Sequence, residues 1–215
     1  MEMLLMLLSV GVIGLAVFLL ILSGLLRQGW LAKFTLAAVG VWFATYAALL
    51  FGVSLASEEK VLALNEPKEF CGFYFDCHMQ TTVTDVRKTK TIGDKTANGE
   101  FYTIRVKIFS DAKRARLGLH DPQFEVVDAD DRKFSRMPSL ENPGSPFDQK
   151  VSPGGGFEKE IVFDLPEDVR AARLDIAEGI GVDKVIESVL IGDEDSIFHK
   201  RTRFKLDANE TVAQN

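Results

Sequence analysis

The chain has 215 residues, a formal net charge of −6, and hydrophobic side chains at 47% of its positions. This acidic balance argues against nucleic acid as a partner, because phosphate-binding surfaces are built from clustered Lys and Arg. The charged residues lie almost entirely after position 56, so an apolar front part and a polar remainder are expected to fold separately.

Two uncharged apolar stretches, residues 3–26 and 34–56, are separated only by residues 27–33. A hydrocarbon core about 30 Å thick needs about 20 helical residues, so each stretch predicts a membrane-spanning helix. Neither stretch contains Asp, Glu, Lys, Arg or His, which argues against a transport path. We therefore expect residues 1–56 to form a two-helix transmembrane anchor in the lipid bilayer.

The orientation of this anchor follows from its short connecting segment, which carries Arg27 and Lys33 and no acid. Because Lys and Arg in short loops remain in the cytoplasm, the rest of the chain is expected outside it, on a multi-pass protein of the bacterial inner membrane. Signal-peptidase cleavage after Ala56 is an alternative, since small residues occupy positions 54 and 56. The apolar stretch before that point is longer than the apolar region of a typical signal peptide, which has 7 to 15 residues.

Small residues recur at four-residue spacing in the second stretch, at Gly40, Ala44 and Ala48. Such a stripe lets two helix backbones approach closely in lipid. We expect it to pack against the first span of the same chain, with pairing of two copies as the alternative.

After a linker over residues 57–69, the chain has its two cysteines, Cys71 and Cys77. Outside the cytoplasm a lone pair most simply forms a disulfide, and the short intervening segment must turn back to allow it. The alternative is a copper or zinc site, since His78 and Met79 follow directly and soft sulfur with imidazole suits those metals. A disulfide would exclude a thiolate pair, so the two hypotheses are mutually exclusive.

Strand patterns dominate the polar part. Residues 101–108 alternate cleanly, with Tyr102, Ile104, Val106 and Ile108 on one face, and Asn98-Gly99 upstream is a turn signal. Residues 124–134 read as a hairpin around an acidic turn. The other expected strands cover residues 81–86, 157–164, 174–176, 185–191 and 198–206. These short strands predict an all-β antiparallel sandwich over residues 70–206, followed by a flexible tail over residues 207–215.

A long segment rich in Pro and Gly, from Pro138 to Gly156, interrupts the strands. Loops of this length in a compact domain are often functional. We expect this loop, together with exposed sheet edges, to form the contact surface.

Several strings resemble a bacterial domain family of unknown function with an immunoglobulin-like sandwich fold. They are Thr-Lys-Thr-Ile-Gly at 89–93, the strand-turn-strand at 126–134, and Ile-Val-Phe-Asp-Leu-Pro at 161–166. Cys71, residues 76–78 and residues 191–200 resemble a membrane-attached subgroup. The resemblance implies an extracytoplasmic location and carries no established catalytic residues.

The chain lacks the usual catalytic signatures, among them Gly-x-Ser-x-Gly and His-Glu-x-x-His. We therefore expect a non-catalytic binding module without a cofactor, whose partner is a protein or another envelope component. The competing expectation is a copper- or zinc-handling protein that uses Cys71, Cys77, His78 and Met79.

Overall fold

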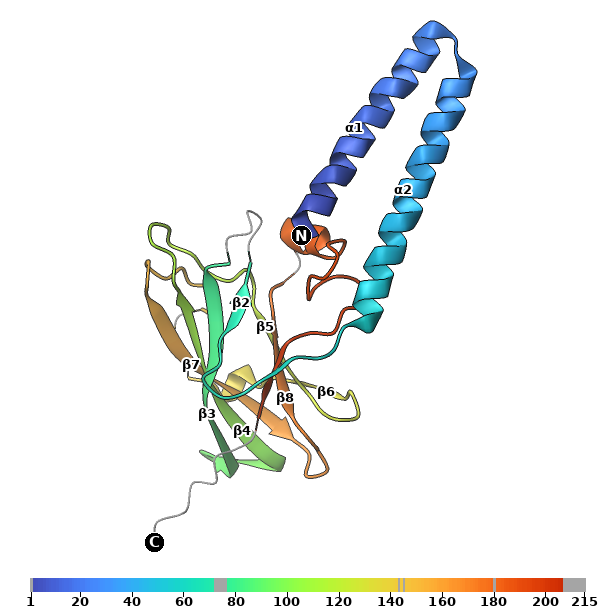
Figure 1. Ribbon diagram of the computed structural model, residues 1–215. Helices are drawn as coiled ribbons and strands as arrows, with labels where there is room; N and C mark the ends of the chain where they lie inside the picture. The colour runs from blue at the N-terminus through green and yellow to red at the C-terminus, as the bar shows by residue number, and fades with distance from the viewer. Residues whose placement is uncertain (1, 72–76, 143, 145, 180, 207–215) are drawn as a thin grey trace. The chain divides into compact units, whose positions relative to one another are not determined.

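The computed structural model describes residues 2–71, 77–142, 144, 146–179 and 181–206 (Figure 1). The chain forms two compact units. The first contains Met1–Glu58 and Lys184–Lys200, and the second contains Glu59–Asp183 and Arg201–Asn215. The expected tail at residues 207–215 lies outside the described residues.

The first unit contains the helices α1 (Glu2–Leu26) and α2 (Gly29–Ala56), which lie side by side (Figure 1). Residues 4–26 and 29–56 are long and apolar enough to cross a membrane. The helix α2 begins five residues before the expected span, because residues 29–33 contain no proline and follow directly on the turn at Arg27, whose φ is 53°. Both basic residues of the predicted loop therefore remain at the turn end of the hairpin.

The two helices meet through a face that contains small polar side chains. The indole Nε1 of Trp42 donates a hydrogen bond to Ser9 Oγ at 3.1 Å, and Ser9 and Thr35 are both buried. Polar side chains of this kind join helices in lipid. These contacts define the side of α2 that is turned toward α1.

The stripe of Gly40, Ala44 and Ala48 lies on the opposite side of α2, and all three residues are exposed. A Cβ added at Gly40 would find nothing within 4 Å. The expectation that this stripe packs against the first span is therefore wrong. Four-residue spacing shows which residues share a helix face, whereas the bulk and hydrogen bonding of other side chains decide which face is turned inward. Pairing of two copies through the stripe stays a prediction.

The second unit is a sandwich of two sheets (Figure 1). The four-stranded sheet has the order β2 (Lys68–Phe70), β3 (Met79–Ile92), β4 (Lys95–Ser110) and β7 (Gly156–Leu165). The five-stranded sheet has the order β1 (Val61–Leu62), β9 (Arg203–Lys205), β8 (Arg173–Ala177), β5 (Gln123–Val127) and β6 (Lys133–Ser135). The predicted β-sandwich is thus confirmed.

The sandwich is antiparallel except at one edge, where β1 pairs with β9 in parallel, with Val61 opposite Arg203. The fully antiparallel expectation is wrong at this point. The residues expected to be linker thus include β1 and the first two residues of β2. They join the sheets because their backbone groups find partners in β9 and β3.

The core lies between the two sheets. The predicted alternation in β4 is confirmed, since Tyr102, Ile104, Val106 and Ile108 are all buried. They face the buried side chains of the other sheet, which include Phe124, Val126, Leu174, Ile176 and Phe204. Removal of this apolar surface from water is the main stabilising contribution to the sandwich.

The hairpin between β3 and β4 turns at Gly93-Asp94, and the predicted turn at Asn98-Gly99 is wrong. Gly93 takes the positive φ of 60° that the tight turn requires. Gly99 lies inside β4 for a different reason, since a Cβ there would come within 2.1 Å of the carbonyl oxygen of Leu165. Gly99 is therefore needed because β7 comes close to β4 at this point, although Asn98-Gly99 resembles a turn in the sequence.

Of two further strand predictions, the one over residues 185–191 is wrong and the one over residues 198–206 is wrong in part. Residues 185–191 contribute to the helix α3 (Val182–Glu187) and to turns, and of residues 198–206 only β9 is a strand. The Lys184–Lys200 segment belongs to the unit that contains α1 and α2, so it has no sheet edge to pair with. The long loop contains one short 3-10 helix, η1 (Pro138–Leu140).

Candidate functional site

The loop between β6 and β7 borders a hollow of about 450 Å³ on the sandwich. Its backbone is held to the sheet where the N–H of Met137 donates to the carbonyl of Val162 at 2.7 Å. This contact covers part of the β7 edge. The described residues around the hollow are Asp121, Pro122, Arg136, Pro138, Glu141, Asn142, Gly144, Pro146, Phe147, Asp148 and Lys159.

One wall of the hollow is a stack of cations and aromatic rings. The guanidinium of Arg136 lies 5.0 Å from the ring centre of Phe147 and 5.8 Å from that of Phe124. Lys159 Nζ lies 4.2 Å from the Phe147 ring centre. Cations over ring faces are attracted by the ring quadrupole, which holds this wall in one arrangement.

Three carboxylates line the hollow, and Glu141 is the buried one, whereas Asp121 and Asp148 are exposed. The Oε2 of Glu141 accepts a hydrogen bond from Arg136 Nη1 at 3.0 Å, and the Glu141 side chain is only 6% exposed. The other oxygen, Oε1, is buried and has no hydrogen-bond partner among the described residues. An unsatisfied buried acceptor is energetically costly, so this oxygen is suited to a donor brought by a ligand.

The hollow thus combines a carboxylate oxygen from the loop with a wall in which Arg136 and Lys159 lie over the buried ring of Phe147. Such a set suits a polar group that donates N–H or O–H to Glu141 and lies against the wall formed by Arg136 and Lys159. Sequence reasoning predicted this loop as a contact surface without identifying these residues. In the sequence, the hollow was indicated only by aromatic and charged residues among the prolines of the loop. These residues come together in space because the loop folds over β7.

The residues of the predicted disulfide and metal site are placed differently. A disulfide joins Cys71 and Cys77, with Sγ atoms 1.98 Å apart. His78 Nδ1 lies 2.5 Å from Asp111 Oδ1, and Met79 is buried in the core. The structure therefore does not bring these four side chains together as one ligand set. The redox state of the cysteines in the cell stays a prediction.

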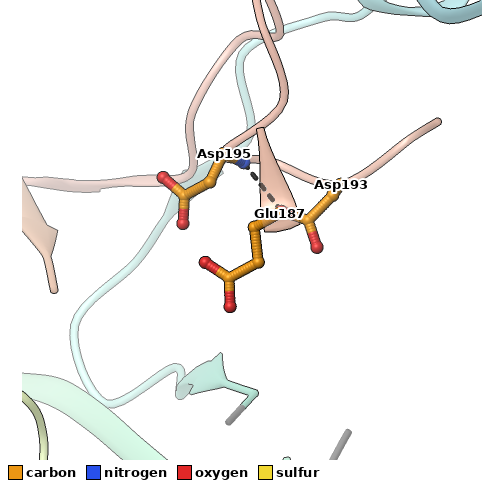
Figure 2. Close-up of side chains that lie close together, drawn as sticks. All are labelled: Glu187, Asp193 and Asp195. Carbon is orange, nitrogen blue, oxygen red and sulfur yellow. Dashed lines mark hydrogen bonds between the residues drawn. The ribbon is translucent and has the colours of Figure 1, made fainter. Parts of the chain in front are cut away.

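A cluster of three carboxylates lies in the Lys184–Lys200 segment (Figure 2). Oxygen atoms of Glu187, Asp193 and Asp195 lie within 4.8 Å of one another. Lys184 forms an ion pair with Asp195, and its Nζ lies 3.8 Å from Glu187. Asp193 Oδ1 accepts a hydrogen bond from the backbone N–H of Asp195 at 2.9 Å. The cluster is thus an ion-pair network that holds a turn, with Lys184 supplying positive charge.

With the fold described, the protein can be placed in a class: a β-sandwich domain that follows two long apolar helices. Residues 76–186, just over half of the chain, match the family model described as "Domain of unknown function (DUF4352)". The chain belongs to this family. The predicted resemblance to a domain family of unknown function is confirmed at this level.

Several solved structures resemble the chain, among them those of three proteins from different organisms. The yjhA protein from Bacillus subtilis is 17% identical, with 67% of this chain and 98% of that chain covered and a TM-score of 0.43. The secreted protein MPT63 from Mycobacterium tuberculosis is 14% identical, with 60% and 95% covered and a TM-score of 0.39. An uncharacterised β-sandwich protein from Clostridium difficile is 12% identical, with 70% and 96% covered and a TM-score of 0.40. Among curated proteins, none matches this chain.

Proposed function

We propose that this protein is a non-catalytic binding module, anchored in the bacterial inner membrane by α1 and α2. Its immunoglobulin-like sandwich faces the extracytoplasmic side and binds a protein or another envelope component. The observation that carries the binding role is the buried, unpartnered Oε1 of Glu141 in the hollow beside Arg136.

The anchoring is supported by the length and hydropathy of both helices. Arg27 and Lys33 lie at the turn end of the hairpin, which favours that end in the cytoplasm. Trp30 is largely exposed at the same end, as expected for an aromatic side chain at the membrane–water boundary. The Cys71–Cys77 disulfide suits an oxidising compartment on the opposite side.

The type of ligand follows from the groups that line the hollow. Glu141 offers an acceptor, while Arg136 and Lys159 lie over the ring of Phe147, whose side chain is itself buried. A peptide segment supplies matching groups, since its N–H can donate to Glu141 and its side chains can pack against the wall that Arg136 and Lys159 form over Phe147. An extended segment of an envelope protein is therefore the ligand that we propose.

A photo-crosslinking amino acid at Asn142, in the full-length protein in bacterial cells, tests this function. Asn142 is exposed and borders the hollow. We expect ultraviolet light to produce a discrete adduct from position 142, and Glu141→Gln to reduce its yield roughly tenfold, since hydrogen bonds to charged groups contribute about 1.5 to 3 kcal/mol.

Two controls make the result specific. The first places the crosslinker at Asp94, in the exposed turn between β3 and β4. The second is Glu125→Gln, which removes a partly exposed carboxylate that pairs with Lys133 of the neighbouring strand in the five-stranded sheet. Equal adducts at 94 and 142, or an adduct that Glu141→Gln leaves unchanged, would show that the hollow does not bind.

A further inference from the structure

We infer that the Lys184–Lys200 segment is embedded in the extracytoplasmic boundary of the bilayer. Its outward apolar side chains, led by Val185 and Phe198, would contact the lipid acyl chains. This inference rests on the proposed membrane anchoring of α1 and α2. It adds a second lipid-contacting element to the protein, formed by a segment about 130 residues after the end of α2.

The segment packs along the last three turns of α2. The Tyr46 hydroxyl donates to the carbonyl of Val189 at 2.7 Å. Further along, the ring centres of Phe51 and Phe198 lie 6.0 Å apart. These contacts place the segment beside the helix itself and within the same compact unit.

Closer to the end of α2, the hydroxyls of Ser54 and Ser196 lie 3.3 Å apart, and both side chains are buried. Beyond the helix, the backbone N–H of Lys200 donates to Ser57 Oγ at 2.8 Å. The segment is thus attached to α2 from Tyr46 to the residue that follows the helix.

The position of Tyr46 sets the depth of the segment. Tyr46 precedes the helix end at Ala56 by ten residues, which is about 15 Å of helix. If Lys33 lies at the cytoplasmic boundary, a hydrocarbon core of about 30 Å reaches about 20 residues further, to the region of Val53. Val189 therefore lies beside a part of α2 that is inside the span.

The segment buries Leu190 and Ile191, but its remaining exposure pattern differs from that expected in water. Val185 is 65% exposed and Phe198 67% exposed. By contrast, the side chains of Lys184, Glu187 and Asp195 are only 19%, 15% and 14% exposed. Burying charged groups in an ion-pair network while exposing aliphatic and aromatic ones is unfavourable in water and suits contact with lipid.

The backbone of the segment is also largely hydrogen-bonded within itself. Ser188 N donates to Lys184 O at 3.0 Å, and Ile197 N donates to Ser188 O at the same distance. His199 N donates to Ser196 O, also at 3.0 Å. Such internal pairing is what a segment near hydrocarbon requires, because few water molecules are available there.

We infer lipid as the contact of this apolar surface because the surface continues that of α2. Phe51 is itself exposed on α2, and its ring contacts that of Phe198, so the apolar surface of the segment continues that of the helix. Other outward side chains of α2, including Val41 and Leu55, are strongly exposed as well. A surface that continues a lipid-facing helix face is most simply covered by the same lipid.

Depth-dependent fluorescence quenching tests the inference on the full chain reconstituted in phosphatidylcholine vesicles. A thiol-reactive fluorophore is attached, without reductant, to Val185→Cys or Phe198→Cys, and the vesicles contain doxyl-labelled phosphatidylcholine. Val41→Cys on α2 is the membrane reference, Asp94→Cys on the sandwich is the aqueous reference, and the parent chain is the blank. All four positions are exposed, so the labels should leave the fold intact.

We expect shallow doxyl groups to quench positions 185 and 198 at least about half as strongly as position 41, and roughly fivefold more than position 94. Quenching at position 41 alone would overturn the inference and leave the anchor in place. Absence of quenching at all labelled positions would overturn the anchor and the inference together. Unquenched variants that form disulfide-linked dimers would show that a second copy covers this surface, which also overturns the inference.

Discussion

The hydroxyl of Tyr46 donates a hydrogen bond to the backbone carbonyl of Val189, 143 positions later in the chain, at 2.7 Å. This bond joins the side chain of Tyr46 in α2 to the stretch that the sequence predicted as a strand over residues 185–191. The bond gives the carbonyl of Val189, which lies in a turn and not in a strand, a hydrogen-bond donor. It therefore helps to explain why this stretch joins the helical unit.

Tyr46→Phe should loosen the segment while leaving the shape of the side chain unchanged. The variant loses one hydrogen bond of about 1 kcal/mol, so amide hydrogen exchange over residues 188–197 should accelerate roughly fivefold. Mass-spectrometric exchange on the full chain in vesicles measures this. The matched control is Thr45→Val, since Thr45 Oγ1 donates only within its own helix, to Val41 O. Equal acceleration in both variants would contradict the assigned role.

Lys68 joins the two sheets from inside the sandwich. It is only 3% exposed, and its Nζ donates to the carbonyls of Ile176 at 2.8 Å and Thr202 at 3.1 Å. Lys68→Met keeps most of the apolar stem but leaves these acceptors without that donor. We expect a loss of about 1 to 3 kcal/mol in the free energy of unfolding, measured by urea titration of the full chain in detergent.

The control for this substitution is Lys95→Met, because Lys95 is exposed at the start of β4. A surface substitution of this kind should change stability by less than about 0.5 kcal/mol. If the two variants unfold at the same urea concentration, Lys68 does not stabilise the pairing of the sheets.

Asp128 organises the acidic turn between β5 and β6. Burial by itself would raise the pKa of its carboxyl, but hydrogen bonds outweigh burial, and the pKa lies below its ordinary value. The backbone N–H groups of Arg132 and Asp130 each donate to Oδ1 at 2.9 Å, and Arg132 Nε donates to Oδ2 at 2.7 Å. The carboxylate thus stabilises the folded turn in its ionised form.

The sign of the pH effect follows from this lowered pKa. As pH falls, the unfolded chain binds the proton before the folded chain does, so the stabilisation is complete above about pH 5. It is lost as pH falls from about 4 through the folded pKa. Asp128→Asn should lower the midpoint of thermal unfolding at pH 7 by roughly 3 to 6 °C, and this difference should shrink toward pH 3.

Asp130→Asn is the matched control, since Asp130 pairs with Arg170 through a half-exposed carboxylate. Its effect should be smaller than that of Asp128→Asn at pH 7, because exposed ion pairs contribute little. If the midpoints of thermal unfolding of wild type and Asp128→Asn differ by the same amount from pH 7 to pH 3, ionisation of Asp128 does not stabilise the fold.

Cys71 and Cys77 should be bonded in the native membrane. Alkylation without reductant should leave both thiols unlabelled, and alkylation after reduction should label both, as measured by intact-protein mass. In the chain-entropy model so short a loop contributes about 2 kcal/mol, so Cys77→Ser should lower stability by about that amount. Ready labelling before reduction would place the sandwich in a reducing compartment or show that the cysteines are free.

Much of the architecture was predictable from local pattern. The apolar stretches indicated both helices because membrane-compatible length and the absence of charge are properties of composition. The alternation through Ile104 and Val106 indicated the buried face of β4 because the side-chain period of a strand is two. Turn residues around Asp128 likewise indicated the β5–β6 hairpin, since short-range hydrogen bonds form it.

Features that depend on a distant partner were not predictable in this way. Gly99 reads as a turn in sequence, yet the approach of Leu165 explains it. The stripe at Gly40 shows a shared helix face, whereas Trp42 and Ser9 decide which face meets α1. In both cases the deciding contact joins residues more than 30 positions apart.

The sequence by itself therefore determined the division of the chain into apolar helices and a β-sandwich, because hydrophobic periodicity is local. Only the tertiary structure decided that the Lys184–Lys200 segment joins the helices, and that Arg136, Glu141 and Phe147 share one hollow. The physical reason is that burial and hydrogen-bond satisfaction depend on which surfaces meet. Which surfaces meet depends on interactions throughout the chain, so a local sequence pattern does not predict it.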